Sequence, residues 1–236
     1  MIPESAFILA AGLGTRLKPY TDTMPKPMVP VNGQPIIGHI LDSLVKAGVK
    51  TAVVNLHHKA DILREYLKTR HDIKIRESYE EELLETGGGT KKALPLIGEK
   101  PFYMINGDAF CLDGPSGPAL ANLARNFDED RMDILLLLEP VSRMILTQGV
   151  GDYDISPDHR PIRRKDRQGE YMFAGIRICH SRIFKNLPEG AFPFLPLMDK
   201  AEQEGRLYAH IHDGDWHHIS TPDDLDRVNK ALSIAA

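Results

Sequence analysis

Cysteine is scarce in this sequence: the 236 residues contain two, Cys111 and Cys179, far apart and without a C-x-x-C pair. This spacing gives no signal for a metal or redox motif and fits a protein of the reducing cytoplasm. No apolar run approaches the roughly 20 residues that cross a bilayer. The short apolar run after Glu4 has no basic segment before it, so we expect no signal peptide.

A surplus of basic residues is also missing. The chain has 29 Lys and Arg against 33 Asp and Glu, a formal net charge of −4. Nonspecific nucleic-acid binders are more often basic, so the net charge argues against this class of protein. Hydrophobic residues make up 42% and charged residues 26%, which is ordinary for a globular protein. The length predicts one domain, 1–236.

One stretch near the N-terminus has the composition of a phosphate-binding loop. The apolar run 6–11 predicts a buried strand, and Gly12 and Gly14 follow it. Glycines can take positive φ and let backbone N–H groups approach an anion closely. Arg16 adds a planar guanidinium with several donors, and Lys26, which stands between two prolines, adds a point charge.

A glycine turn that binds no ligand is the plainer alternative. A Rossmann fingerprint and a P-loop are excluded, because the third glycine and the Gly-Lys-Ser/Thr sequence are absent.

Strand and helix patterns alternate over the first hundred residues, with strands at 6–11, 51–55, 73–76 and 101–105 and helices at 35–47 and 61–67. This order predicts a parallel sheet with helices on both faces. The second half has fewer helices between its strands. We expect strands at 133–139, 151–155, 171–179 and 206–211, and helices at 119–127, 194–204 and 222–232.

Two further segments suggest a ligand site. Three glycines, 87–89, stand between a strand and a helix expected at 91–96, and such a run favours close backbone approach to a ligand. Asp108 follows an apolar strand in Asn-Gly-Asp, which is ordinarily a hairpin turn. Ligands of open α/β sheets bind at the carboxyl ends of strands, however, and a carboxylate there can hold Mg²⁺ against phosphates.

Leu-Ala-Ala-Gly-x-Gly-Thr-Arg-Leu at 9–17, with Pro-Lys-Pro-Met-Val-Pro-Val at 25–31, closely resembles the signature of the sugar-1-phosphate nucleotidyltransferases. The resemblance implies a Rossmann-like α/β fold of the GT-A type, with a mixed, mostly parallel central sheet flanked by helices. It implies an enzyme that transfers a nucleotidyl group from an NTP to a sugar 1-phosphate and releases pyrophosphate. Residues 1–110 would form the nucleotide-binding half, and 111–236 the sugar-phosphate-binding half.

The same resemblance assigns roles to single residues. Arg16 would hold the leaving pyrophosphate and Lys26 the α-phosphate region, and these are the two expected catalytic residues. The expected nucleotide-binding residues are Ala10, Ala11, Gly12, Gly14, Thr15, Gly87 and Gly88.

The resemblance also implies a divalent metal, Mg²⁺ with Mn²⁺ as a possible substitute. Asp108 matches one metal ligand of the family, and His218 stands where the family has its second aspartate. Imidazole is an uncommon Mg²⁺ ligand. Two roles for His218 follow: it would bind the metal directly, or it would hold a metal-bound water or a phosphate. Thr221, in the same segment, is expected to cap the last helix.

Four residues are expected to bind the sugar phosphate: Asn106, Gly149, Gly175 and Lys165. Many members of the family carry Glu-Lys-Pro before the strand that contains Gly175, and this chain has Arg163-Arg164-Lys165 instead. That basic cluster serves the acceptor phosphate or forms a solvated turn; the sequence leaves both interpretations open.

Substrate preference rests on Leu-Glu-Thr-Gly-Gly-Gly at 84–89, which is similar to the branch of the family that acts on N-acetylmuramate α-1-phosphate. The similarity implies UTP as the donor and a cytoplasmic role in peptidoglycan recycling for the cell wall. Glu85 departs from the broader Leu-Gly-Thr-Ala-Gly pattern. The alternatives are a mannose- or other hexose-1-phosphate guanylyl- or uridylyltransferase, and a non-catalytic nucleotide-sugar sensor. We expect a monomer or small homo-oligomer, with no nucleic-acid or membrane partner.

Overall fold

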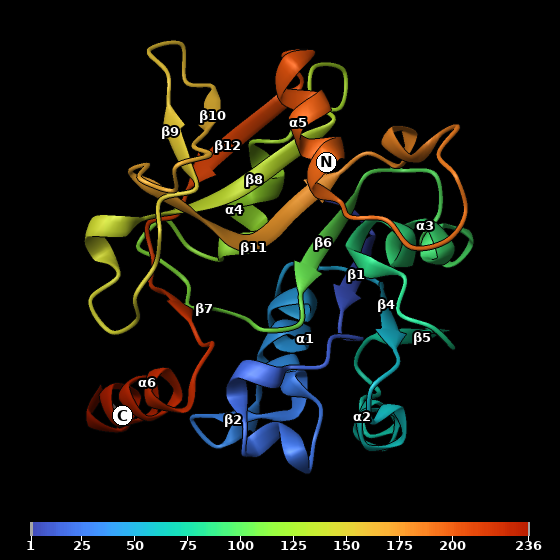
Figure 1. Cartoon of the computed structure of the whole chain (residues 1–236), viewed down its shortest axis with the longest axis vertical. Coiled ribbons are helices and arrows are strands. Elements are labelled where there is room, and N and C mark those ends of the chain that lie inside the picture. Colours follow the sequence, from blue (N-terminus) through green and yellow to red (C-terminus); the bar gives the residue numbers. More distant parts are fainter. Residues whose placement is uncertain (1, 236) are drawn as a thin grey trace.

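The computed structural model describes residues 2–235, which fold around a nine-stranded mixed sheet (Figure 1). Its parallel part has the order β6-β1-β4-β5, formed by β1 (Ser5–Leu9), β4 (Thr51–Leu56), β5 (Lys74–Tyr79) and β6 (Phe102–Asn106). Phe7 of β1 lies opposite Val53 and Met104, and all three are fully buried. Strands that are buried on both faces have continuous apolar sequences, which is why the sequence predicts the strands of this half.

The second half of the chain extends the same sheet through antiparallel pairing. β11 (Tyr171–Cys179) lies between β6 and β8 (Ile134–Pro140), antiparallel to both, and β12 (Leu207–Ile211) runs parallel to β8. The hairpin of β9 (Tyr153–Ile155) and β10 (Pro161–Arg163) joins at β11. The expected mixed α/β sheet flanked by helices is confirmed.

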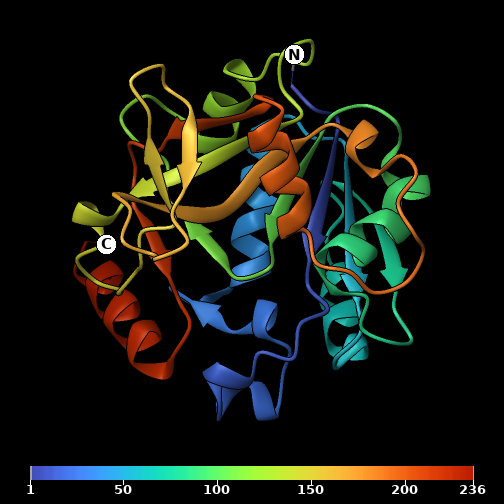
Figure 2. The same cartoon turned by 45° about the horizontal axis from the view of Figure 1, so that its top comes forward.

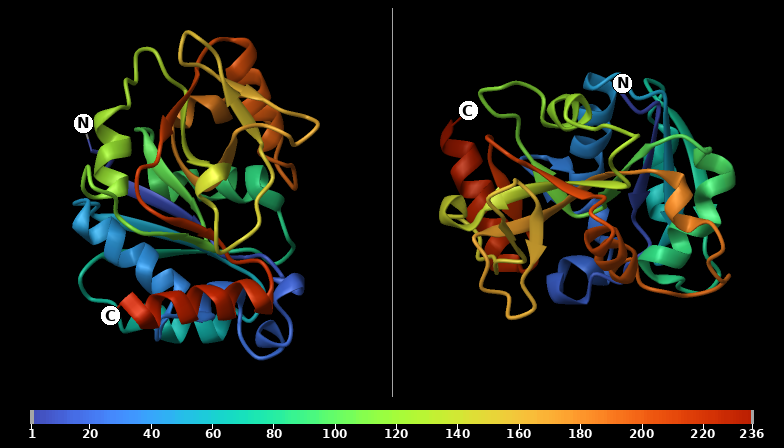
Figure 3. Two further views of the ribbon diagram at one scale, coloured as in Figure 1. Left: turned by 90° about the vertical axis from the view of Figure 1, so that its left-hand side faces the viewer. Right: turned by 90° about the horizontal axis from the view of Figure 1, so that it is seen from above.

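Helices cover both faces of this sheet. One face is covered by α1 (Ile36–Lys46), α2 (Ala60–Lys68), α4 (Ala119–Arg125) and α6 (Pro222–Ala235) (Figure 3). Buried leucines, isoleucines and a valine of these helices pack in one core with Ala6 and Ile8 of β1. On the other face α3 (Glu85–Ile97) and α5 (Leu195–Gln203) pack with Phe7 (Figure 2). Successive side chains of β1 point to opposite faces of the sheet, so the strand contributes to two hydrophobic cores. No helix within residues 2–235 is both long and apolar enough to span a bilayer.

The start of α3 differs from the expectation. The helix begins at Glu85, six residues before the expected start at 91, so the three glycines lie inside its first turns. A Cβ on Gly88 would stand 2.1 Å from the Gly190 carbonyl oxygen, and one on Gly89 would stand 2.6 Å from Glu80 Oε1. The glycines therefore allow the helix to pack closely against its neighbours, which offsets their low helix propensity.

A small two-stranded ladder brings the end of the chain back to the main sheet. β13 (Trp216–His218) pairs antiparallel with β7 (Ala109–Cys111), and His218 lies opposite Ala109. The chain then enters α6, where Thr221 Oγ1 accepts a hydrogen bond from Asp224 N at 3.2 Å. The Asp224 carboxylate accepts in return from Thr221 N at 2.9 Å. This reciprocal cap confirms Thr221 as the N-cap residue of α6.

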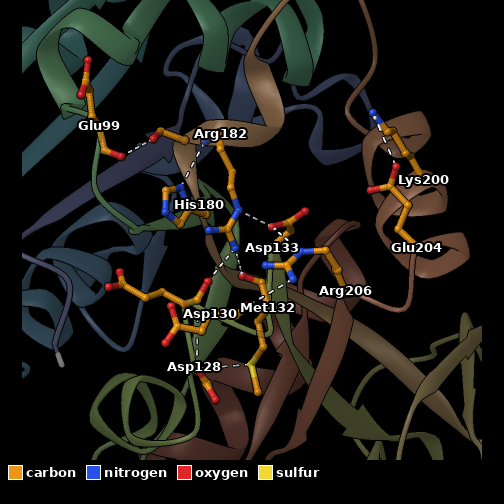
Figure 4. Close-up of polar contacts among 12 residues, drawn as sticks. Glu99, Asp128, Asp130, Met132, Asp133, His180, Arg182, Lys200, Glu204 and Arg206 are labelled. Carbon is orange, nitrogen blue, oxygen red and sulfur yellow. Dashed lines mark hydrogen bonds and ion pairs between the residues drawn. The ribbon is translucent and has the colours of Figure 1, made fainter.

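An ion-pair node centred on Asp133 lies at the edge of the sheet opposite the glycine loop. The Asp133 carboxylate, just before β8, accepts from Arg182 Nε at 2.5 Å and from Arg206 Nε at 2.9 Å (Figure 4). Burial acts to raise the pKa of Asp133, but hydrogen bonds and charge from the two arginines outweigh it and hold the pKa below its ordinary value. The node thereby fastens the start of β12 to β8 and to the turn after β11.

A small third ladder lies beside the glycine loop. β2 (Pro30–Val31) pairs antiparallel with β3 (Gln34–Pro35), and the short turn Lys26–Met28 precedes them. Ile36 N donates to the Val29 carbonyl oxygen at 3.1 Å, which ties the start of α1 to this segment. The lysine of the Pro-Lys-Pro frame is thus held between the glycine loop and α1.

Candidate active site

A cavity of about 390 Å³ lies at the carboxyl ends of the parallel strands, where ligands of open α/β sheets bind. It extends from the end of β6, past the loop after β1, to the ends of β4 and β5. Nine of the residues singled out in the sequence line it: Ala10, Ala11, Gly12, Gly14, Thr15, Arg16, Lys26, Asn106 and Asp108.

The glycine loop is held at both of its ends. Ala10 N and Ala11 N donate to Asn55 Oδ1 at 2.5 and 3.2 Å, which fixes the exit from β1. Further on, Gly14 takes φ +64°, and its carbonyl oxygen accepts from Thr21 Oγ1 at 2.9 Å. A Cβ on Gly14 would lie 3.0 Å from Lys26 Cβ, so this glycine lets the lysine approach the loop.

Lys26 and Asp108 meet at one end of the cavity. Lys26 Nζ lies 2.6 Å from Asp108 Oδ2, and the lysine side chain is only 12% exposed. Pro25, at φ −69° and ψ 150°, and Pro27 restrict the backbone from which the lysine extends. Gly107 N donates to the Leu9 carbonyl oxygen at 2.8 Å, which ties the turn carrying Asp108 to the end of β1. Arg16 lines the same cavity and adds a second cation.

His218 lies beside this end, on the β7–β13 ladder, but it does not line the cavity. Its partner in the ladder, Ala109, directly follows Asp108 in the chain. The His218 ring stacks on Trp216 with centroids 5.7 Å apart and planes 9° apart, and its backbone N donates to Thr147 Oγ1 at 3.0 Å. Burial lowers the pKa of His218 despite the opposing charge of Asp108, so the imidazole is neutral at pH 7.

The opposite end of the cavity contains polar groups that the sequence analysis did not assign. Glu80 is 1% exposed; its Oε1 accepts from Asn55 Nδ2 at 2.7 Å, and its Oε2 accepts from Leu84 N at 3.0 Å. Asn55 and Glu80 therefore connect the glycine loop to the start of α3. Their signal in the sequence was a polar residue at the end of a strand, the same signal that identified Asp108.

Gly87 and Gly88 do not line the cavity. Their N–H groups donate to the Phe192 carbonyl oxygen at 2.9 and 3.1 Å, and both residues are buried under the segment before α5. Glu85 and Thr86, from the same segment, are the residues that reach the cavity wall.

The residues expected to bind the sugar phosphate do not all lie at the cavity. Asn106 lines the cavity, and Gly175, at φ +73°, packs against it: a Cβ there would lie 3.1 Å from Asn106 Nδ2. Within the described residues, the buried Asn106 Oδ1 has no hydrogen-bond partner. Gly149 packs instead against two methionines, and a Cβ on it would lie 2.5 Å from Met144 Sδ.

The basic cluster Arg163-Arg164-Lys165, at the end of β10, lies outside the cavity lining. Arg163 pairs with Asp199 through two hydrogen bonds of 2.6 and 2.9 Å, and Arg164 pairs with Asp154 and Asp166. Lys165 is exposed in the turn that follows. The two arginines are thus occupied by carboxylates of the same chain, as in a solvated turn.

Comparison with known proteins identifies the fold and its chemistry. Residues 5–144 match the family model described as nucleotidyl transferase. This chain belongs to the nucleotidyl transferase family. It is 38% identical over 228 residues to the N-acetylmuramate alpha-1-phosphate uridylyltransferase of Caulobacter vibrioides, covering 93% of both chains. It is 29% identical to the D-glycero-alpha-D-manno-heptose 1-phosphate guanylyltransferase of Aneurinibacillus thermoaerophilus, covering 96% of this chain and 97% of the relative.

Among solved structures, a UDP-glucose pyrophosphorylase complexed with UDP-glucose has the same fold. The TM-score is 0.81 with full coverage of both chains, at 17% sequence identity. Membership of the family makes this protein an enzyme of the nucleotidyltransferase class.

The donor set at the Lys26 end suits a metal held jointly with a nucleotide. Within residues 2–235, no three His, Cys, Asp or Glu side chains form a group able to hold a metal by themselves. Mg²⁺ commonly takes one or two carboxylates together with substrate phosphates, so a complete protein cage is not required. Asp108 supplies such a carboxylate, 32% exposed and facing the cavity.

Proposed function

We propose that this nucleotidyl transferase moves a uridylyl group from UTP to N-acetylmuramate α-1-phosphate and releases pyrophosphate. The observation that carries the proposal is one cavity in which the glycine loop, Arg16, Lys26 and Asp108 converge at the ends of parallel strands. The near-full-length similarity to the Caulobacter vibrioides enzyme supports the choice of substrates.

In the proposed reaction an acceptor phosphate oxygen attacks the α-phosphorus in line. A bond forms between that oxygen and the phosphorus, and the bond from the α-phosphorus to the leaving pyrophosphate oxygen breaks. The acceptor phosphate is already ionised at neutral pH, so no strong general base is needed. Catalysis then consists of positioning and charge stabilisation.

Each group in the cavity has a place in this scheme. The N–H groups of the glycine loop approach the triphosphate, and Arg16 holds the pyrophosphate that leaves. Lys26 stabilises charge on the α-phosphate. Asp108 would hold Mg²⁺, with His218 beside it as a direct or water-mediated contact. Bound Mg²⁺ neutralises phosphate charge and orients the triphosphate.

The acceptor would bind on the β11 side of Asp108, where Asn106 and Gly175 meet. The unpartnered Asn106 Oδ1 can accept a hydrogen bond from a sugar hydroxyl or amide. With UTP and a cell-wall sugar phosphate as substrates, the enzyme would act in the cytoplasm, in a step that recycles peptidoglycan sugar.

A panel of four NTPs against several sugar 1-phosphates, read as pyrophosphate release, tests the proposal. UTP with N-acetylmuramate α-1-phosphate should give the highest kcat/KM. Highest activity with GTP and a heptose or mannose 1-phosphate would instead support a guanylyltransferase, a candidate favoured by the similarity to the Aneurinibacillus thermoaerophilus enzyme. Nucleotide binding without turnover on any acceptor would contradict both.

A further inference from the structure

A second cavity, of about 400 Å³, lies beside the Asp133 node and shares no lining residue with the catalytic cavity. One wall is the loop after α4, and the other is the tip of the β9–β10 hairpin, which packs beside β12 (Figure 1). The buried Met132 and Leu135 give it apolar surface, and Tyr208 of β12 lines it as well. None of these residues has a part in the reaction proposed above.

Two arginine side chains, one from each wall, meet at the Tyr208 ring. The guanidinium carbon of Arg160 lies 3.8 Å from the ring centroid, and that of Arg131 lies 5.7 Å from it. Arg160 is also held by a hydrogen bond, because its Nη1 donates to the Gly205 carbonyl oxygen at 2.7 Å. The fold thus brings two cations from distant segments of the chain to one aromatic ring.

The charges of these two arginines are not balanced by a carboxylate. Within residues 2–235, Arg131 and Arg160 form no ion pair, unlike the neighbouring Arg206. Asp158 also lines the cavity, but its Oδ1 accepts from Ser156 Oγ at 2.5 Å inside the hairpin. Two guanidinium groups at one ring repel each other, and a bound anion would turn that repulsion into two attractive contacts.

We propose that this cavity binds a phosphate-bearing ligand, a phosphate monoester or a diphosphate, between Arg131 and Arg160. A guanidinium presents several N–H donors in one plane, which suits two oxygens of a phosphate. Asn126 and His159 line the same cavity and can hydrogen-bond to the hydroxyl groups of an ester. The ligand is bound outside the catalytic cavity, so it does not compete with the nucleotide. The inference does not depend on which substrates the enzyme takes.

NMR of the whole protein labelled with ¹⁵N-arginine tests the site directly, with inorganic pyrophosphate and α-glucose 1-phosphate as the two probes. The Nε–H signals of Arg131 and Arg160 are assigned by their loss in Arg131→Gln and Arg160→Gln. With at least one probe, both signals should shift and saturate with one shared Kd below about 1 mM. The Arg16 signal reports binding in the catalytic cavity separately.

The variants then show whether the two arginines hold one ligand. Arg131→Gln should weaken the binding seen at Arg160 by about tenfold, because one of two charge-assisted contacts is lost. Arg167→Gln is the matched control, because Arg167 is exposed and lines neither cavity, and it should leave that Kd unchanged.

Two sets of results would overturn the proposal. In the first, the signals of Arg131 and Arg160 stay in place with both probes, or move without saturation up to about 10 mM, as for an adventitious ion only. In the second, the two signals saturate with different Kd values, or Arg131→Gln leaves the Kd at Arg160 unchanged. Saturation by pyrophosphate alone would assign a diphosphate ligand, and saturation by α-glucose 1-phosphate alone would assign a monoester.

Discussion

The two halves of this enzyme hold their candidate site residues in different ways. Up to Asp108, the site residues lie after β1 and β6 of the parallel sheet or, for Lys26, on a turn that packs against the glycine loop, and backbone hydrogen bonds such as Gly107 N to the Leu9 carbonyl oxygen fix their position. Beyond Asp108, the candidates lie on antiparallel strands and long loops. His218 lies on the β7–β13 ladder beside Asp108, and neither His218 nor Lys165 lines the cavity.

The difference follows from strand direction. All carboxyl ends of a parallel sheet lie at one edge, so residues after successive strands converge there. Antiparallel strands place alternate ends at opposite edges, so a residue at a strand end has no preferred edge. Four predictions test this contrast, from the largest expected effect to the smallest.

Lys26→Met should lower kcat by roughly 100- to 1,000-fold, by analogy with the loss of one preorganised donor at a reacting centre. The lysine stands on a turn that two prolines restrict, and its side chain is only 12% exposed, so water does not replace its charge. Steady-state kinetics with the best substrate pair would show the loss. Lys18→Met is the control: Lys18 is 62% exposed and pairs with Asp22 outside the cavity lining, and this variant should stay within about twofold. Near-normal turnover of Lys26→Met would contradict the assigned role.

His218 tests whether the second half contributes to metal binding. If His218 contacts the metal, Mn²⁺ should support activity at least as well as Mg²⁺, because Mg²⁺ prefers oxygen ligands. His218→Asp should then shift the Mn²⁺/Mg²⁺ activity ratio toward Mg²⁺ by about tenfold. His218→Ala with an unchanged ratio would show that the histidine is only part of the ladder and that Asp108 acts without it.

Glu139 tests the energetic cost of a buried charge in the second half. It is 1% exposed, and burial raises its pKa to about 7, opposed by Arg143, whose Nε lies 3.7 Å from Oε1. Between the ordinary pKa of 4.5 and 7, the folded state keeps a proton that the unfolded state has lost, so stability falls as pH rises through this window. The penalty above pH 7 amounts to about 3 kcal/mol.

Glu139→Gln should remove this penalty and unfold at higher urea concentration than the wild type at pH 8, with little difference at pH 4.5. Glu81→Gln, which changes an exposed carboxylate, should show no such pH-dependent gain. An equal difference between Glu139→Gln and the wild type at both pH values would contradict a pKa raised by burial.

Lys165→Ala should change the KM for the sugar phosphate by less than about twofold, because an exposed lysine outside the cavity lining has little contact to lose. Arg163→Ala should cost at most about 1 kcal/mol of unfolding free energy, through the loss of its partly exposed pair with Asp199. A tenfold rise in KM for Lys165→Ala would show that the turn closes over the acceptor.

The sequence was most informative where local chemistry and topology agree. Gly12, Gly14, Arg16, Lys26 and Asp108 were predicted as one site, and all line one cavity. Gly87 and Gly88 were misplaced for a physical reason. A run of glycines is ambiguous between contact with a ligand and contact with backbone, and here the Gly190–Phe192 segment fills the space a Cβ would need.

By itself, the sequence determined the α/β class and grouped the glycine loop with Arg16, Lys26 and Asp108, because these depend on local pattern and on the shared edge of parallel strands. Only the tertiary structure decided how distant partners combine. It tied Asn55 to Glu80, occupied Arg163 and Arg164 with carboxylates, and held Glu85 at positive φ in the cavity wall. Such pairings depend on long-range packing and desolvation, for which no local pattern in the chain encodes the partner.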